Sequence, residues 1–299
     1  MPLDPSLLGH ETTPQTGTIT DADVREFADA IHDDNPLFRD PAAAERAGFA
    51  DIPTPPTFIT RFRVAFAEAG LDPEHMQVLH GEQEYSYTRP LVVGDTLTVR
   101  HRVATLRQST RAGGMAIMTL EQLADTFDGQ QVALGKSTLI IRDAPPEAAS
   151  DSAVGSSGAG APTGKAPSTP TGEAIPTLVK HVTQEQINAY ADASGDHNPI
   201  HLDPEKARAV GLSGTIAHGM LSMAFLGQAL TDWLAAQPGS HGWVARLRVR
   251  FQAMAYPGDT LRCHGVLGAQ ADGRQRVELW IENQRGERLT TGDADVVVA

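Results

Sequence analysis

The 299-residue sequence predicts an α+β protein that contains two copies of one unit, each with helical segments followed by an antiparallel sheet. Three observations support this fold class. Each half of the chain opens with helical periodicity and closes with Val-, Thr- and Leu-rich runs typical of strands. The two halves match one another at a constant offset. A segment of biased composition separates them, so we expect two domains joined by a linker.

The composition excludes several broad classes of function. The formal net charge is −13, with 24 Lys and Arg against 37 Asp and Glu, whereas nucleic-acid binding needs a positive field. No apolar stretch reaches the roughly 20 residues of a membrane span, and the N-terminus lacks the basic and apolar regions of a signal peptide. The single cysteine, Cys263, forms no intrachain disulfide and fits a reducing compartment. We expect a cytoplasmic protein without a nucleic-acid partner.

The first domain is expected over residues 1–142. A capped helix starts at Thr20 and is interrupted by Asp33-Asp-Asn-Pro36, because a residue before proline is pushed out of the α region. The apolar stretch 57–69 predicts a longer helix. Turn residues then separate strand-like runs over about 78–142, which indicates an antiparallel meander.

Residues 143–176 are expected to form a flexible linker. Ala, Pro, Ser, Gly and Thr dominate this segment, and it shows neither helical nor strand periodicity. Such a composition cannot bury enough apolar surface to offset the entropy lost on ordering.

The second domain, 177–299, repeats the order of the first. A capped helix starts at Thr183, and the turn Asp196-His-Asn-Pro199 follows it. A long helix is expected over about 219–236, with apolar residues on more than one face, as in a helix buried on most sides. Four strands are expected after it, at 243–256, 260–267, 276–283 and 289–298.

The repeat aligns without gaps at an offset of 163 residues. It superimposes Asp33-x-Asn-Pro36 on Asp196-x-Asn-Pro199, and Asp40-Pro41 on Asp203-Pro204. An Asp-Pro pair places an N-cap before the first residue of a helix, so each copy should begin a short helix there.

The differences between the copies are more informative than the matches. His201 is replaced by Phe38, which cannot transfer a proton, and Gly219 is replaced by Pro56, which has no backbone N–H. If a site needs an imidazole and an N–H at a helix start, only the second copy retains it.

The second copy therefore holds the candidate site. Asp196 and His201 lie around the Asn198 turn, and His218 and Gly219 begin the long apolar helix, which suggests an acid/base pair near a helix N-terminus. A purely structural turn is the alternative for Asp196. The same Asp and His side chains could also bind a metal, but their spacing fits no familiar ligand pattern, and we expect none.

The run Gly195-Asp-His-Asn-Pro-Ile-His201, with Ala217-His-Gly-Met220 downstream, resembles the hydratase-2 motif of MaoC-like (R)-specific enoyl-thioester hydratases and dehydratases. The resemblance covers residues 177–299. It implies the hotdog fold, in which a curled antiparallel sheet wraps a long central helix, and a reaction without metal or organic cofactor.

The first half resembles the N-terminal MaoC-like dehydratase domain, in which the equivalent of Pro55-Pro-Thr-Phe58 is characteristic and the catalytic histidine is absent. Together the halves resemble a single-chain version of the two-subunit (3R)-hydroxyacyl-ACP dehydratases of actinobacterial fatty-acid elongation. This implies a double hotdog, which is an internal pseudo-dimer, and leaves a homodimer of the whole chain open.

Carried over to this chain, the resemblance makes Asp196 and His201 the catalytic pair and Gly219 the oxyanion donor, with Asn198 and His218 in the substrate-binding set. The implied reaction is reversible hydration of trans-2-enoyl thioesters to (3R)-hydroxyacyl thioesters of CoA or acyl carrier protein. Two alternatives remain: a hotdog acyl-thioesterase, which needs a carboxylate on the central helix, and a non-catalytic acyl-thioester-binding or assembly subunit. The altered first copy is expected to add an elongated acyl tunnel.

Arg246, Arg248 and Arg250 alternate with apolar residues, so one face of their strand is basic. A solvated face is one interpretation. The other is a contact with CoA phosphates or with an acidic acyl carrier protein.

Overall fold

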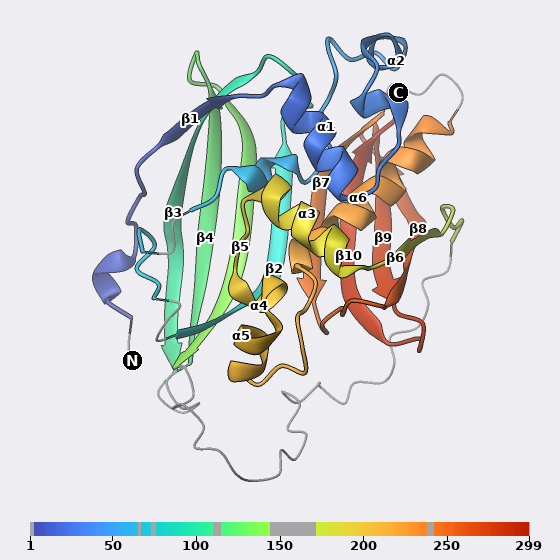
Figure 1. Cartoon of the computed structure of the whole chain (residues 1–299). Coiled ribbons are helices and arrows are strands. Elements are labelled where there is room, and N and C mark those ends of the chain that lie inside the picture. The colour runs from blue at the N-terminus through green and yellow to red at the C-terminus, as the bar shows by residue number, and fades with distance from the viewer. Residues whose placement is uncertain are drawn as a thin grey trace.

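The computed structural model describes residues 3–64, 67–72, 76–109, 115–143, 172–237 and 242–298. Ten strands of these residues form one antiparallel sheet in the order β1-β3-β4-β5-β2-β7-β10-β9-β8-β6 (Figure 1). Strands β1 to β5 come from the first half of the chain and β6 to β10 from the second. The order reads the same from both ends once each strand is replaced by its repeat partner, so the two halves are related by an internal pseudo-two-fold.

The strands of the first half are β1 Gln15–Thr18, β2 Met76–Tyr87, β3 Thr96–Ser109, β4 Met115–Thr126 and β5 Gln131–Asp143. Those of the second half are β6 Leu178–His181, β7 Trp243–Phe251, β8 Thr260–Ala271, β9 Arg274–Glu282 and β10 Arg288–Val297. The halves join where β2 pairs with β7, in a register that places Glu82 opposite Arg250 and Ser86 opposite Arg246.

Paired helices lie on the concave side of this sheet. Helix α1 Asp21–Ala30 and helix α3 Gln184–Ser194 each start at a threonine N-cap, Thr20 and Thr183, whose hydroxyl accepts a backbone N–H. The expected Asp-Pro starts are also confirmed, since Asp40 and Asp203 cap α2 Pro41–Arg46 and α5 Pro204–Ala209. The repeat was therefore sufficient to place four helices.

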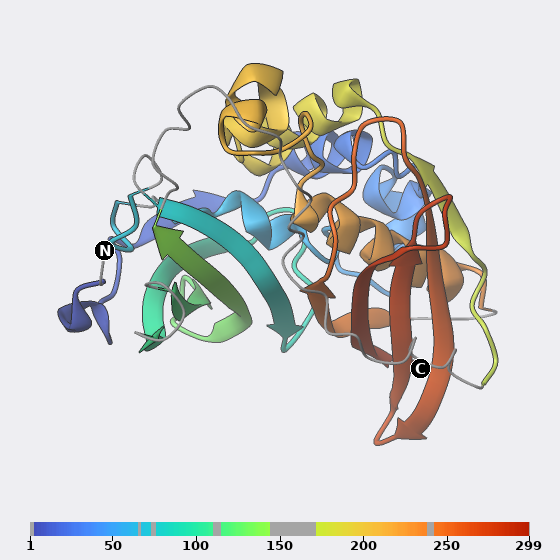
Figure 2. The ribbon, with the colours of Figure 1, turned by 90° about the horizontal axis from the view of Figure 1, so that it is seen from below.

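The long apolar helix is α6 Gly219–Ala235, and it is almost entirely buried. Seen from below, the two halves of the sheet curl separately, and α6 lies inside the curl of the second half (Figure 2). None of the helices in the described ranges is long and apolar enough to cross a membrane.

The helix expected over 57–69 is wrong. In the described part of that stretch the chain forms only one 3-10 turn, η3 Phe58–Arg61. The side-chain amide of Gln122 donates to the carbonyls of Ile59 and Phe62, at 3.1 and 2.6 Å. These bonds hold two carbonyls that an α-helix would direct to its own following turns. The first half therefore has no described counterpart of α6.

The expected linker is shorter than 143–176 at its C-terminal end. Residues 144–171 lie outside the described residues. Ala174 bridges to Val266, and the buried Ile175 donates its N–H to the carbonyl of Gly265 at 3.0 Å. This segment packs against the second half because Ile175 supplies an apolar anchor that the preceding composition lacks.

The largest apolar core is continuous across the two halves. Phe27 of α1 makes edge-to-face contacts with Phe58 and with Tyr190 of α3, at ring-centroid distances of 5.6 and 5.8 Å. The two expected domains thus share one core and one sheet, and side chains of both halves pack together at the boundary.

Candidate active site

The Asp196 turn is built by two side chains that accept backbone N–H groups. Helix α3 ends at Gly195, which has a φ of +74°, a conformation that glycine adopts without strain. Asp196 then accepts the N–H of Asn198 at 3.4 Å, and Asn198 accepts the N–H of Ile200 at 3.3 Å. Asn198 thereby caps the short helix α4 Pro199–Leu202, which holds His201. Asn198, which was expected in the substrate-binding set, fixes the turn in this geometry.

His201 is buried and its ring has one defined partner. Its Nδ1 lies 2.9 Å from the carbonyl oxygen of Ile216, which can only accept, so Nδ1 carries the proton and Nε2 keeps a lone pair. Burial lowers the pKa of His201, mainly because a charged imidazolium loses its hydration. The ring is therefore neutral near pH 7 and can take up a proton at Nε2.

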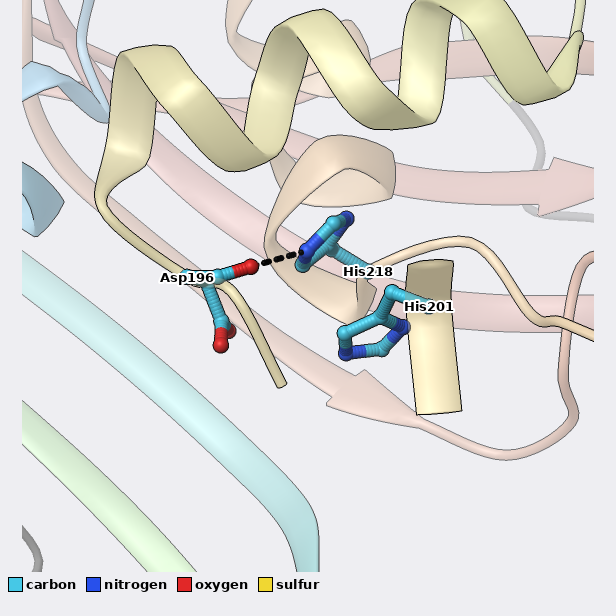
Figure 3. A group of neighbouring side chains, drawn as sticks. All are labelled: Asp196, His201 and His218. Atoms are coloured by element: carbon cyan, nitrogen blue, oxygen red, sulfur yellow. Dashed lines mark hydrogen bonds between the residues drawn. The ribbon is translucent and has the colours of Figure 1, made fainter. Parts of the chain in front are cut away.

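His218 has a positioning role in this geometry. It is the N-cap residue of α6, and its Nε2–H donates to the backbone carbonyl of Asp196 at 2.9 Å (Figure 3). Its ring also lies against that of His201, with centroids 3.8 Å apart. Burial and the neighbouring His201 lower the pKa of His218 to about 4, so it too is neutral. His218 ties the turn to the start of α6.

Arg63 completes the site, and sequence reasoning missed it. Its Nη1 lies 2.9 Å from Oδ2 of Asp196, across the boundary between the halves. Burial opposes ionisation of Asp196, but the Arg63 guanidinium together with the two histidines lowers the pKa of Asp196 below its ordinary value. No motif marks Arg63, and its partner in the repeat, Leu226, is apolar.

Asp196, His201 and His218 each place one oxygen or nitrogen within 4.8 Å of the others. Two hydrogen bonds of about 2.8 Å to one water span about 4.6 Å, so a single water can bridge the carboxylate and an imidazole. The same three groups could be considered as metal ligands. However, the Arg63 guanidinium already neutralises the carboxylate and would repel a divalent cation.

Gly219 lies at the start of α6, as predicted. It is the first residue of the helix, so its N–H has no acceptor within the helix, and the positive end of the helix dipole adds to it. A Cβ at this position would lie 3.1 Å from the ring of Phe251. That contact is tight, which explains why a residue without a side chain fits here.

These residues line one cavity of about 400 Å³. Its lining includes Asp196, His201 and Gly219. The cavity continues into the first half, where Arg63 and Tyr85 also line it. The first-half residues that line it include apolar side chains, such as Phe62, Leu120 and Leu139, and polar ones, such as His101 and Gln122. The cavity thus extends into the first half, where the described residues form no long helix equivalent to α6.

The structure does not bring Arg246, Arg248 and Arg250 to this cavity. They face carboxylates at the seam between β2 and β7: Arg246 pairs with Glu84 at 2.8 Å and Arg248 with Glu82 at 2.9 Å. Arg250 pairs with the same Glu82. Each arginine therefore contacts a carboxylate of β2, with Arg248 and Arg250 sharing Glu82, and the three side chains help to join the two halves.

Comparison with known proteins agrees with this architecture. Residues 6–134 match the family model of the FAS1-like dehydratase domain region, and residues 166–285 match the MaoC like domain. A UPF0336 protein from Thermobifida fusca is 39% identical over 138 residues, which are 44% of this chain and 89% of that protein.

Solved structures show the same fold over the whole chain. One MaoC-like dehydratase has a TM-score of 0.81 at 22% identity, covering 98% of this chain and 99% of its own. A conserved hypothetical protein from Mycobacterium tuberculosis, described as having a double hotdog fold, has a TM-score of 0.67 at 15% identity, covering 98% and 96%. The fold is thus a double hotdog. The chain thus combines a FAS1-like dehydratase domain region in its first half with a MaoC like domain in its second half.

Proposed function

We propose that this protein catalyses the reversible addition of water to trans-2-enoyl thioesters, which yields (3R)-hydroxyacyl thioesters. The observation that carries the proposal is the pairing of an ionised Asp196 with a neutral His201 in one cavity. Their polar atoms lie within 4.8 Å of each other, the distance at which one water can touch both.

The residues can be assigned to each part of the reaction. In hydration, His201 Nε2 takes one proton from the bridging water, while the carboxylate of Asp196 accepts a hydrogen bond from the O–H that remains. The water oxygen bonds to C3, and the electrons of the C2–C3 double bond move to the thioester oxygen. The N–H of Gly219 stabilises that oxygen, and the imidazolium of His201 then returns a proton to C2. Dehydration is the same sequence in reverse.

The cavity suggests how the substrate lies. The thioester carbonyl would face Gly219, and the acyl chain would extend between Arg63 and Tyr85 into the apolar part of the cavity in the first half. In this placement the cavity would serve as the elongated acyl tunnel expected from the altered first copy. We propose thioesters of CoA or of an acyl carrier protein as the substrate class, since both present the same acyl-pantetheine group.

A thioesterase is less well supported by this site. That activity would need a carboxylate on the central helix, and the only acidic residue of α6 is Asp232. Its carboxylate accepts a hydrogen bond from Asn35 at 3.4 Å, on the side of the first-half turn. It therefore does not face the His201 cavity.

Loss of crotonyl-CoA absorbance gives a direct test. The wild type is expected to hydrate crotonyl-CoA, and Asp196→Asn and His201→Ala are each expected to lose about 10²–10⁴ in kcat. His197→Ala is the matched control, because His197 lies in the same turn but is exposed and pairs only with Asp192. Full activity in both site variants, or no hydration by the wild type with any enoyl thioester tested, would refute the proposal.

A further inference from the structure

A second cavity, of about 310 Å³, is lined by residues of α2 and of the end of α6. These elements lie at the opposite end of the molecule from α5 (Figure 1). Asn35, Phe38 and Pro56 line one side of it. Trp243 and Val244 of β7 line the other side. It is separate from the cavity that contains His201, since the two share no lining residue.

The internal pseudo-two-fold relates the linings of the two cavities residue by residue. At the offset of 163 residues, Asn35 corresponds to Asn198, Leu37 to Ile200 and Pro53 to Ile216. The correspondence also holds across the seam, because Val244 on β7 takes the place of His80 on β2 at an offset of 164. The second cavity is therefore the counterpart of the active-site cavity and is formed by the same architecture.

The turn of the first half keeps its shape without the catalytic groups. Asp33 accepts the N–H of Asn35 at 3.0 Å, and Asn35 accepts the N–H of Leu37 at 3.0 Å, as in the second half. Phe38 replaces the base, and Pro56 removes the N–H of the oxyanion donor. This cavity can accept an apolar chain but cannot hydrate it.

The residues that line this second cavity indicate which kind of ligand it would bind. Most of its surface is apolar, and its volume of about 310 Å³ has room for a short acyl chain. The exposed Arg46 stands among the lining residues, held only by a long 3.8 Å contact with Asp40. The residue that corresponds to Arg46 in the repeat is Ala209, so the active-site cavity has no cation at the equivalent position.

We propose that this cavity is a non-catalytic binding site for the short acyl chain of a second thioester molecule, with Arg46 facing its anionic head. The choice of thioester rests on the function proposed above. The existence of the site rests on the symmetry of the two cavities, and it can be tested without any turnover.

Hexanoyl-CoA is a suitable probe because it has no double bond to hydrate. Calorimetric titration of the full chain should give two binding equivalents per chain. Trp243 lines the second cavity and no tryptophan lines the catalytic one, so tryptophan emission should change as the second site fills. Trp243→Phe should abolish that change and retain both equivalents.

Ala43→Phe fills the cavity, because Ala43 is a half-buried lining residue of α2. Ala42→Phe, on the adjacent exposed position, is the matched control. The first variant should lose one equivalent and the Trp243 response while keeping its hydration rate. The control should keep both. Ala47→Phe provides a second filling variant at the end of the same helix.

A single equivalent in the wild type with unchanged Trp243 emission would refute the second site, and so would two equivalents in both filling variants. Either result leaves hydration intact. Conversely, a protein without hydratase activity whose Trp243 emission still reports hexanoyl-CoA would keep the second site and refute the proposed function.

Discussion

Arg63 is expected to act on catalysis mainly through its ion pair with Asp196, and Arg63→Met tests this. The ion pair is partly shielded, with side chains 29% and 19% exposed. Exposed pairs contribute up to about 1 kcal/mol and breaking buried ones costs about 3–5 kcal/mol, so about 2 kcal/mol is expected here. If the same energy of about 2 kcal/mol is lost from stabilisation of the transition state, kcat/KM falls by about 30-fold. Because Asp196 orients the water and does not hold the acyl chain, most of the loss should appear in kcat.

The pH profile separates positioning from a structural role. In the wild type the pKa of His201 lies below the ordinary 6.5, so kcat/KM should fall on the acid side only below that pH. Without Arg63, burial dominates and raises the pKa of Asp196, and the lost positive charge also raises the pKa of His201. Both changes move the acid limb to higher pH. Arg63→Lys should restore part of the rate and most of the profile.

Arg61→Met is the matched control. Arg61 also joins the halves, because it donates to the carbonyl of Ala193 at 2.7 Å, but it forms an ion pair with Asp23 at 3.0 Å rather than with Asp196. It should lower the melting temperature and leave the pH profile of kcat/KM in place. An unchanged profile in Arg63→Met, whatever its stability, would show that the reasoning about Asp196 is wrong.

Three further predictions concern metal, stability and the seam. Exhaustive EDTA treatment should leave hydration unchanged, because the Arg63 charge opposes a cation beside Asp196; activity lost to EDTA and regained with zinc would contradict this. Burial raises the pKa of Asp33 to about 6. Its protonated form is thus favoured in the folded state, and the ionised form costs stability as pH rises through 6. Asp33→Asn should therefore gain about 2–3 kcal/mol at pH 8 and nothing at pH 3, measured by urea unfolding. Replacing Arg248 and Arg250 together by Glu should lower the melting temperature and leave KM for crotonyl-CoA unchanged; a raised KM would return these residues to substrate binding.

The sequence predicted the parts of the fold that depend on local chemistry. Thr20, Thr183 and the two Asp-Pro starts were visible because N-caps and Pro at the first helical position act over one turn. The repeat then transferred each assignment from one half to the other. The Val-, Thr- and Leu-rich runs predicted the strands of each half. They did not predict that β2 pairs with β7, because neither strand sequence alone identifies a partner from the other half.

The failures have the same origin. The stretch 57–69 is apolar enough for a helix, and only the Gln122 amide from a distant strand shows why it does not continue. Arg63 lies in that stretch and reaches Asp196 because the chain is not helical there. The arginines of β7 looked free because their carboxylate partners, Glu82 and Glu84, lie on β2. Each error concerned a contact between segments far apart in sequence.

The asymmetry of the two halves accounts for both cavities at once. In the second half α6 fills the curl of the sheet and lines the cavity beside Asn35 through Leu234, and this cavity, at about 310 Å³, is smaller than the catalytic cavity of about 400 Å³. In the first half the described residues of the corresponding space form η3 and the Arg63 segment, and the cavity that contains His201 continues there along β2, β4 and β5. Since a helix and an acyl chain compete for the same volume, the loss of one long helix lengthens the catalytic cavity and frees Arg63 to reach Asp196. The second half thus supplies Asp196, His201 and Gly219, and the first half supplies the Arg63 charge and the space into which the acyl chain would extend.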